Sequence, residues 1–503
     1  MGVRERESRD VCGKGFARVR RGSTACLFFV LFAAVLSAAG VSAADGGGGS
    51  TAPGPAAVGG VLEARVADSH VLFVCGVGEG VGKVFIRISF PFPSAVRVEG
   101  RLNGEPAGAV ESVKFEVKRD EGVYEVSNGV VSVRVEERRW KMSITRNGGG
   151  VVFAEFDGGG DFSGMGVGAG MVRVTAAMHP GERFYGFGEK FDGVDQRGKE
   201  VTMELSDAYQ STTGATYKSI PFFISSGRYG ILLNSPMRCV FRMGSVSDGF
   251  YSFEVPDGEI DYYVFADEGP LGVIRDYTEV TGRIKLVPRW ALEPWLSRRE
   301  MVGWTNTATA EADVDMMIAD GYRLGVVLWE GFRRRFYRTY EKQVPDITDL
   351  VNRWHRMGLK LVFWSMTGQL DDTPEEREKY GFSEERNGEF FVRNPDGSFL
   401  LGGIHGGKVY IDPTNPEAME WWLKTVYEHR LLGEGGASTR EKWNLDGVKI
   451  DFCEFFPGDE TPVLMKDRRK GMANIHPVLF SERVYDWRQE MKPDGGITWV
   501  RGG

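Results

Sequence analysis

The chain has 503 residues, of which 42% are hydrophobic and 12% aromatic, enough apolar mass to predict a globular protein of two or more domains. Its formal net charge is -8 at pH 7, and no basic stripe occurs beyond the N-terminal leader. Because a nucleic-acid binder neutralises phosphates with clustered Lys and Arg, this balance argues against nucleic acid as a partner.

The N-terminal segment has the layout of a secretory signal peptide. Basic residues between Arg4 and Arg21 precede an apolar stretch from Ala25 to Leu36, and Ser42 to Ala44 offer the small residues of a cleavage site. We expect residues 1–44 to be removed, which would leave a secreted or lumenal protein without stable membrane association. An uncleaved signal anchor and an organelle transit peptide are the alternatives.

The next two regions differ sharply in composition. Residues 45–60 are mostly Gly, Ser, Ala and Pro, which predicts a disordered linker because such residues bury too little apolar surface to offset the entropy of ordering. From residue 61 to 280, short β-branched or alternating apolar runs predict an N-terminal β-sandwich domain. The clearest expected strands are Val71–Cys75, Val84–Ser89, Val113–Val117, Val130–Val135 and Tyr262–Phe265.

Residues 281–503 alternate strand-like runs with helical stretches, which predicts a parallel sheet. The expected strands are Glu300–Trp304, Leu324–Trp329, Leu359–Trp364, Leu445–Phe452 and Ile497–Val500. The expected helices are Ala310–Asp320, Ile347–Met357, Pro416–Leu432 and Val478–Met491. Insertion-rich loops after the strands favour the first part of a (β/α)8 TIM barrel, incomplete because only five strand units fit. A doubly wound open sheet is the alternative, but no Gly-x-Gly-x-x-Gly turn opens its first helix.

The most informative string is Asp446-Gly-Val-Lys-Ile-Asp-Phe-Cys-Glu-Phe-Phe-Pro457. A strand buried on both faces of a parallel barrel is expected to be apolar, yet this one contains Lys449 and leads into Asp451 and Glu454. Barrel strands carry their chemistry at their C-terminal ends, where a carboxylate can attack an anomeric carbon and a nearby cation can keep it ionised. The structural alternative is that Asp451 caps the loop or pairs with Lys449.

Several segments of the predicted β-sandwich accompany this string. They are Arg183-Phe-Tyr-Gly-Phe-Gly-Glu-Lys-Phe191, Arg197-Gly198, Tyr217-Lys-Ser-Ile-Pro-Phe-Phe-Ile-Ser225 and Tyr229-Gly-Ile-Leu-Leu-Asn234. In order and spacing, these segments and the Asp446–Pro457 string resemble glycoside hydrolase family 31 from about Arg183 to Gly503. The family's usual nucleophile signature is Lys-x-Asp-Phe-Gly-Glu followed shortly by Pro, and this chain departs from it by having Cys453 in place of Gly.

The resemblance implies a galactose-mutarotase-like N-terminal domain and a retaining α-glycosidase of the α-glucosidase, α-xylosidase or sulfoquinovosidase type. In a retaining mechanism Asp451 attacks the anomeric carbon, a second carboxyl protonates the leaving oxygen, and water releases the sugar. The family's acid/base Asp lies in a Trp-x-Gly-Asp string, and no such string follows Arg501. We therefore expect the chain to be C-terminally incomplete and inactive as given. A carbohydrate-binding protein without turnover and a family transglycosylase are the alternatives.

Beside Asp451, we predict that Glu454 belongs to the catalytic residues and that Lys449 belongs to the substrate-binding residues. The resemblance assigns further residues to substrate binding. Trp364 matches the family's sugar-stacking Trp, and Arg501 matches an arginine near the sugar and the nucleophile. Asp207 matches an aspartate on a β-domain loop that reaches the aglycone side, while Asn474 fits the helix after the nucleophile loop. The alternatives are a core Trp, a terminal surface Arg, a solvated carboxylate and a structural Asn.

One departure bears on the substrate. The family commonly has a sugar-binding Asp after its second barrel strand, where this chain has Glu330, a longer carboxylate that would reach a different hydroxyl. Arg333 to Arg335 follow and could bind an anionic sugar substituent, with a solvated basic face as the alternative. We expect an oligosaccharide or glycoside substrate and neither cofactor nor metal, and the sequence does not predict an oligomeric state.

Overall fold

The computed structural model describes residues 55–78, 82–168, 170–209, 211–297, 307–329, 347–403, 406–428, 446–491 and 495–502. These ranges belong to one compact unit, Pro53–Gly503. The predicted leader, the predicted strand Glu300–Trp304, Glu330 and Arg333 to Arg335 lie outside the described residues. Within the described ranges, no helix combines the length and the apolar character needed to cross a membrane.

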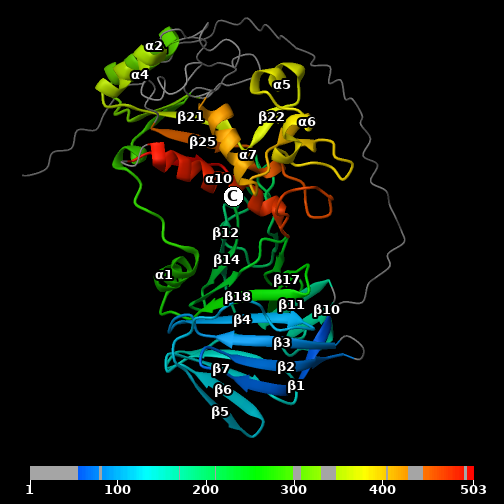
Figure 1. The fold of residues 1–503 in the computed structure, drawn as a ribbon. Coiled ribbons are helices and arrows are strands. Elements are labelled where there is room, and N and C mark those ends of the chain that lie inside the picture. Colours follow the sequence, from blue (N-terminus) through cyan, green and yellow to red (C-terminus); the bar gives the residue numbers. More distant parts are fainter. Residues whose placement is uncertain are drawn as a thin grey trace, which may run out of the picture. The chain divides into compact units, whose positions relative to one another are not determined.

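The N-terminal half is built from antiparallel strands, which confirms the predicted β-sandwich (Figure 1). A 13-stranded sheet has the order β12-β14-β15-β18-β4-β3-β2-β1-β10-β11-β17-β16-β13, and a five-stranded sheet has the order β5-β6-β7-β8-β9. The strands are β1 (Ala56–Val66), β2 (Val71–Val77), β3 (Gly82–Ser89), β4 (Ala95–Leu102), β5 (Glu116–Asp120), β6 (Val123–Ser127), β7 (Val131–Glu136), β8 (Met142–Arg146), β9 (Gly150–Ala154), β10 (Met165–Gly168), β11 (Met171–Ala177), β12 (Phe184–Gly188), β13 (Glu200–Thr202), β14 (Ser219–Ser225), β15 (Tyr229–Leu233), β16 (Val240–Arg242), β17 (Phe250–Val255) and β18 (Glu259–Phe265), with the 3-10 turn Gly160–Phe162 before β10.

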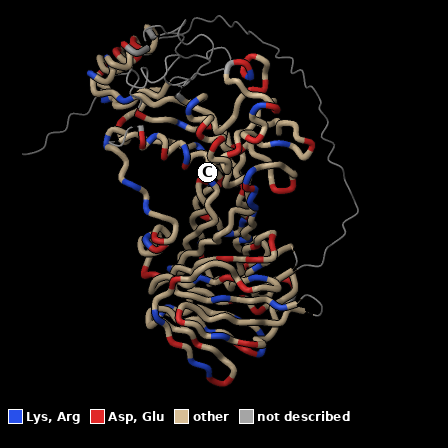
Figure 2. Tube along the Cα trace, in the orientation of Figure 1, with Lys and Arg blue, Asp and Glu red and all other residues tan. Residues whose placement is uncertain are grey.

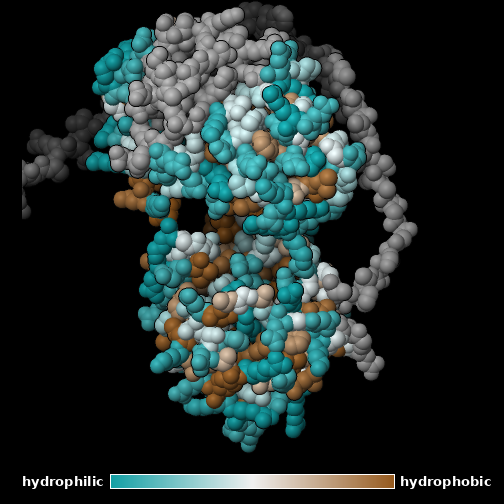
Figure 3. Space-filling model, viewed as in Figure 1, coloured by the Kyte–Doolittle hydropathy of each residue, from teal (hydrophilic) through white to brown (hydrophobic). Residues whose placement is uncertain are grey.

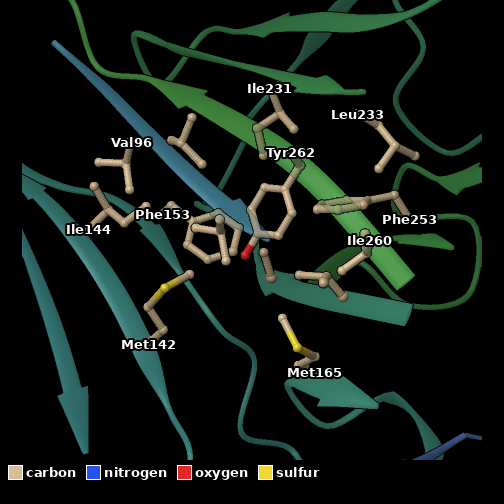
Figure 4. Packing of buried hydrophobic residues seen from close by; sticks show 14 of the residues in the cluster. Val96, Met142, Ile144, Phe153, Met165, Ile231, Leu233, Phe253, Ile260 and Tyr262 are labelled. Carbon is tan, nitrogen blue, oxygen red and sulfur yellow. The ribbon is translucent and has the colours of Figure 1, made fainter. Parts of the chain in front are cut away.

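The core of this half lies where the two sheets face one another. In Figure 4, Tyr262 of β18 lies among Phe253 of β17, Phe153 of β9 and Ile144 of β8. The ring centroids of Phe253 and Tyr262 are 5.2 Å apart and nearly perpendicular, a favourable edge-to-face geometry. Exposed apolar residues of the same half are scattered among hydrophilic ones in Figure 3, which is normal for a soluble surface.

The predicted linker 45–60 ends too late. Strand β1 begins at Ala56, and Ala56 and Ala57 pair with Val167 and Gly166 of β10. The small residues serve close packing, because a Cβ placed at Gly60 would lie 2.7 Å from the carbonyl oxygen of Arg138. The small residues that suggested a linker therefore form the start of a strand, where they allow another backbone segment to approach closely.

The predicted strand Val113–Val117 is also misplaced, since β5 begins only at Glu116. The N–H of Val113 donates to Phe90 O at 2.8 Å, so the segment before β5 attaches to the end of β3 instead of extending the β5–β6 ladder. Val113 and Phe115 pack against the hydrophobic core. Their alternation therefore reports burial of side chains rather than sheet pairing.

The C-terminal half contains a parallel five-stranded sheet in the order β19-β20-β21-β25-β26, as the barrel prediction requires (Figure 1). Three predicted strands are confirmed within one or two residues at each end, and Ile497–Val500 is confirmed exactly as β26. Strand β20 lies between two parallel neighbours, β21 and β19, and β19 begins at Trp295. The elements are α1 (Pro270–Thr281), the 3-10 helix Arg289–Leu292, β19 (Trp295–Ser297), α2 (Thr307–Ala319), β20 (Val326–Trp329), α4 (Ile347–Arg356), β21 (Lys360–Met366), α7 (Pro416–Trp421), the π-helical segment Trp422–Glu428, β25 (Gly447–Asp451), the 3-10 helix Cys453–Phe455, α10 (Met472–Met491) and β26 (Ile497–Val500).

An insertion between β21 and α7 forms a small antiparallel sheet in the order β22-β24-β23. Its elements are β22 (Gln369–Asp371), α5 (Pro374–Tyr380), α6 (Glu384–Asn387), the 3-10 helix Gly388–Phe390, β23 (Leu401–Gly402) and β24 (Lys408–Tyr410). The hydroxyl of Tyr410 donates to Phe455 O at 2.6 Å. The insertion is thereby attached to the loop that follows β25.

Helix α10 begins at Met472, before the predicted start at Val478. The carboxylate of Asp459 accepts hydrogen bonds from the N–H groups of Gly471 and Met472, at 2.6 and 3.3 Å. These contacts satisfy donors that a helix N-terminus leaves unpaired, so the helix starts ahead of Pro477. Along the described trace, acidic and basic residues are interspersed (Figure 2).

Candidate active site

The carboxylate of Asp451 stands at the C-terminal end of β25 and is 6% exposed. Its Oδ2 accepts a hydrogen bond from Trp364 Nε1 at 2.7 Å, and its Oδ1 accepts one from the N–H of Phe452 at 3.0 Å. Arg501 Nε lies 2.8 Å from Oδ1, and Lys449 Nζ lies 3.6 Å from Oδ2. Both oxygens face donors or cations, so the negative charge is compensated in spite of burial.

The parallel sheet explains why these residues meet. Met366 is in register with Asp451, and Ile450 is in register with Val500, so β21, β25 and β26 end at one edge. Trp364 lies near the end of β21, and Arg501 directly follows β26. The carboxyl ends of parallel barrel strands share a rim, which brings side chains far apart in sequence to one place.

Phe452 turns the chain sharply after Asp451. It has φ 57° and ψ 49°, the left-handed conformation that non-glycine residues rarely adopt. Its carbonyl oxygen accepts a hydrogen bond from Gln369 Nε2 at 3.1 Å, and its ring lies edge-on to Trp364 with centroids 5.8 Å apart. Such strain, on the order of 1–3 kcal/mol, is typical of functional turns held by their surroundings.

Cys453 occupies the position where the family signature has Gly, and the structure shows that the side chain is accommodated. Cys453 opens the 3-10 helix Cys453–Phe455 and has no positive φ, because the left-handed residue is Phe452. Its side chain is 2% exposed and belongs to the hydrophobic core beneath the sheet's rim. The substitution fills core space, so it does not narrow the surface around the Asp451 carboxylate.

Glu454 contacts Arg501, which also contacts Asp451. The Glu454 side chain is 0% exposed and forms an ion pair with Arg501 Nη2. Its Oε2 has no hydrogen-bond partner among the residues described, and burial raises the pKa of Glu454. Arg501 thus links the two carboxyls, and a direct catalytic role for Glu454 stays a prediction.

The β-sandwich half contributes Tyr217 to this site, a residue that the sequence did not single out. The Arg501 guanidinium carbon lies 4.5 Å from the ring centres of both Tyr217 and Phe452. Tyr217 OH donates to Asp207 Oδ1 at 2.9 Å, and burial raises the pKa of Tyr217. Asp207 is therefore joined to the site through Tyr217 and Arg501. Its role toward an aglycone stays a prediction.

Asn474 of α10 ties the two halves together. Its Nδ2 donates to Met203 O at 3.1 Å and to Pro236 O at 2.9 Å, and its Oδ1 accepts from the N–H of Leu205 at 3.1 Å. Both N–H donors and the oxygen of the Asn474 amide are thereby hydrogen-bonded to backbone groups of the N-terminal half. Asn474 fixes the segment that leads toward Asp207, which agrees with its structural alternative.

Other predicted positions are less informative. Trp364 is half-buried and directs its indole N–H to Asp451, while sugar stacking by its face stays a prediction. Glu330 and Arg333 to Arg335 fall outside the described ranges. Over the described part of the chain, no group of three or more His, Cys, Asp or Glu could hold a metal ion.

Comparison with known proteins places this arrangement in a family. Residues 85–241 match the glycosyl hydrolase 31 N-terminal galactose mutarotase-like domain, and residues 284–503 match the family 31 TIM-barrel domain. The α-xylosidase XylQ of Lactiplantibacillus pentosus is 25% identical over 337 residues, which are 66% of this chain and 42% of XylQ. Alpha-glucosidase 2 of Bacillus thermoamyloliquefaciens is 27% identical over 386 residues, 73% of this chain and 47% of that protein.

A solved structure agrees in fold. The cycloalternan-forming enzyme from Listeria monocytogenes, in complex with a pentasaccharide substrate, superposes with a TM-score of 0.78 at 20% identity, over 89% of this chain and 44% of that chain. The chain thus spans less than half the length of these relatives. Two successive domain matches from one family, over residues 85–241 and 284–503, together cover most of the sequence. The chain belongs to glycoside hydrolase family 31.

Proposed function

We propose that the full-length protein is a retaining α-glycosidase that hydrolyses O-glycosidic bonds of α-linked sugars, with Asp451 as the nucleophile. The observation that carries this proposal is the Asp451 carboxylate, buried at a barrel-strand end with a donor or a cation on each oxygen. Burying a carboxylate costs free energy of desolvation, so its retention at a strand end indicates a functional role for the charge. The relatives named as α-xylosidase and α-glucosidase support the same reaction class.

The contacts of Asp451 suit a double displacement. In the first step an Asp451 oxygen forms a bond to the anomeric carbon while the bond to the leaving oxygen breaks, and a second carboxyl gives that oxygen its proton. In the second step the second carboxyl, deprotonated in the first, takes a proton from water while the water oxygen bonds to the anomeric carbon and the ester bond to Asp451 breaks, which restores both carboxyl groups. Trp364 N–H and Phe452 N–H hold the carboxylate in place throughout, so little reorganisation accompanies the loss and return of its charge.

The rival proposal, a carbohydrate-binding protein without turnover, makes no use of this carboxylate as a nucleophile. The test is to treat the full-length protein with a fluorinated α-glycosyl trap and to locate the label by peptide mass spectrometry. We expect the label on the peptide that contains Asp451 and none after Asp451→Ala. A label on Glu454 would overturn the assignment, and binding of the sugar without any label would favour the rival.

Transfer to a sugar acceptor is a second candidate, because one fold relative is named for the cycloalternan that it forms. Both reactions pass through the same glycosyl-enzyme and differ only in what attacks it. Product analysis with increasing concentrations of a disaccharide acceptor separates them. Transfer products that dominate at millimolar acceptor would make the protein a transglycosylase, whereas free sugar alone would make it a hydrolase.

We also propose that the protein enters the secretory pathway. The basic, apolar and small-residue segments of residues 1–44 support this proposal. N-terminal sequencing of the mature protein from its native cells is the test. A mature N-terminus near Ala44 in the secreted fraction is expected, and an intact leader in a cytosolic fraction would contradict the proposal.

A further inference from the structure

Two buried side chains, Thr367 and Cys453, lie at the backbone carbonyl of Asp451 and not at its carboxylate. Thr367 follows β21 and donates both its N–H and its hydroxyl to the carbonyl oxygen of Asp451, at 3.0 and 2.9 Å. Cys453 Sγ lies 2.9 Å from the same hydroxyl oxygen, Thr367 Oγ1. Thr367 is 1% exposed and Cys453 is 2% exposed, so water does not compete for these contacts.

The chemistry of the two groups orders these contacts. The Thr367 hydroxyl has one hydrogen and two possible acceptors, Asp451 O and Cys453 Sγ, each 2.9 Å away. Because a carbonyl oxygen is a stronger acceptor than a thiol sulfur, we assign the hydrogen to Asp451 O, which leaves the hydroxyl oxygen to accept from the Cys453 thiol. The other acceptor near the sulfur, Ile450 O, is 3.9 Å away and already accepts from Arg501 N–H. Burial raises the pKa of Cys453 to about 11, which keeps the thiol protonated and able to donate.

The contacts join three neighbouring strand ends. Thr367 follows β21, Asp451 ends β25, and Gly502 lies just beyond β26. A Cβ placed at Gly502 would lie 3.0 Å from Cys453 Cβ, so the thiol residue fills the space between β25 and the chain after β26. Glycine at position 453, the usual residue in the family signature, would supply neither the donor nor this contact.

We propose that Thr367 and Cys453 form a hydrogen-bonded clamp that positions the Asp451 nucleophile by fixing the orientation of its peptide group. Thr367 and Cys453 are positioning residues and do not meet the substrate. The clamp rests on the proposed function for its catalytic consequence. The clamp also helps to hold the left-handed conformation of Phe452, because the fixed Asp451 carbonyl belongs to the peptide group that joins Asp451 to Phe452.

The test uses four variants of the full-length protein. Thr367→Val removes the hydroxyl and keeps the shape, Thr367→Ser restores a hydroxyl, and Cys453→Ala removes the thiol donor. Thr414→Val is the control, because the Thr414 hydroxyl donates to Asp412 Oδ1 instead of to Asp451. We expect Thr367→Val to lower kcat and the trap-labelling rate about tenfold while KM changes less than about twofold, because a displaced nucleophile slows chemistry more than binding. Thr367→Ser should recover most of the loss, and Thr414→Val should behave as wild type.

A double variant measures the coupling. If the thiol acts through the Thr367 hydroxyl, Thr367→Val in the Cys453→Ala background should slow labelling by less than it does alone. Full additivity would overturn the clamp. So would a Thr367→Val variant whose kcat equals that of wild type, or one that loses thermal stability without any change in kcat per folded molecule.

An activity-independent measurement separates this inference from the proposed function. Hydrogen exchange of the peptide 447–456 should be faster in Thr367→Val than in wild type and unchanged in Thr414→Val. A wild-type protein that takes no trap label but shows this exchange pattern would overturn the proposed function and leave the clamp standing. A labelled wild type with identical exchange in all four variants would do the reverse.

Discussion

Strand β25 is flanked by two buried aspartates that differ in their partners. Asp446, just before the strand, is 0% exposed; its Oδ2 accepts from Leu361 N–H at 2.9 Å and meets His355 Nε2 at 2.7 Å. Asp451, at the other end, is held by Trp364, Arg501, Lys449 and the strained turn. The Asp446 carboxylate, at the N-terminal (lower) end of β25, accepts from a backbone N–H of β21. The Asp451 carboxylate, at the C-terminal (upper) end, is contacted by side chains of β21 and β25 and by Arg501 after β26.

This contrast follows the usual division of a parallel barrel, in which the N-terminal ends of the strands serve stability and the C-terminal ends serve chemistry. Lys360 Nζ, 3.4 Å from Asp446 Oδ1, compensates the charge of Asp446, which stays buried. A buried charge alone therefore does not mark a nucleophile. What distinguishes Asp451 is the combination of a strand end, two cations and a left-handed turn that aims the carboxylate.

The largest expected effect is at the upper end. Asp451→Asn should lower kcat of the full-length protein by at least about 10³-fold, because the amide cannot form the glycosyl ester. The protein should stay folded but lose some stability, because Arg501 and Lys449 lose their carboxylate partner. Steady-state kinetics on an activated aryl α-glycoside, with thermal unfolding as the control, measure both. Activity within tenfold of wild type would place the nucleophile elsewhere.

The corresponding substitution at the lower end, Asp446→Asn, should affect stability and not catalysis. Asp446→Asn keeps the shape but leaves His355 and Lys360 without a carboxylate, and we expect the free energy of unfolding to fall by about 2 kcal/mol. Because Asp446 lies outside the site, kcat per folded molecule should stay within about twofold of wild type. Urea denaturation and active-site titration together measure this, and a kinetic loss without destabilisation would erase the distinction between the two ends.

Trp364 tests a single donor at the upper end. Trp364→Phe retains an aromatic face for a sugar but removes the N–H that Asp451 Oδ2 accepts, so kcat should fall about tenfold, as expected for one hydrogen bond to a charged group. Trp295→Phe is the matched control, since that indole donates to the carbonyl of Ala291 instead. A Trp364→Phe variant with normal kcat and raised KM would show that Trp364 contributes only through stacking.

The long apolar strands of the parallel sheet could be predicted from the sequence, whereas short strands and helix starts could not. The runs that became β20, β21 and β25 are apolar and mostly buried, and their bounds could be predicted to within one or two residues. The run that became β26 was also predicted, although its residues are half-buried or exposed. The insertion strands β22 to β24 were missed because strands of two or three residues carry no measurable alternation. The early start of α10 was missed because the residue that caps it, Asp459, is remote in sequence.

The site shows the same limit. The Lys449, Asp451 and Glu454 string, together with the resemblance, pointed to residues that the structure brings to one rim. The pairing of Glu454 with Arg501 and the approach of Tyr217 depend on which strand ends meet, which no local pattern reports. The αL conformation of Phe452 was also hidden, since its residue type rarely adopts it.

The smallest expected effect extends the comparison to the histidines beside the two ends. His355 at the lower end has the Asp446 carboxylate as a partner. His476 instead hydrogen-bonds to a backbone carbonyl, Ile411 O, at 3.2 Å and stacks on Phe456 with ring centroids 4.2 Å apart. Burial without a compensating charge lowers the pKa of His476 to about 4, from an ordinary value of 6.5. His476 is thus neutral in the folded protein and becomes charged on unfolding below pH 6.5.

The unfolded state therefore binds more protons than the folded state between pH 6.5 and about 4, and stability falls as the pH drops through that window. From pH 7 to 5.5, His476 alone should reduce the free energy of unfolding by about 1 kcal/mol. Urea denaturation at both pH values should show that drop for wild type and for the exposed-site control His179→Gln, and a smaller one, by about that amount, for His476→Leu. Identical pH dependence in all three proteins would contradict this prediction and would mean that His476 is accessible to water in the folded protein. The segment after β25, whose Phe456 stacks on His476, would then be less well packed than the residues around Asp446.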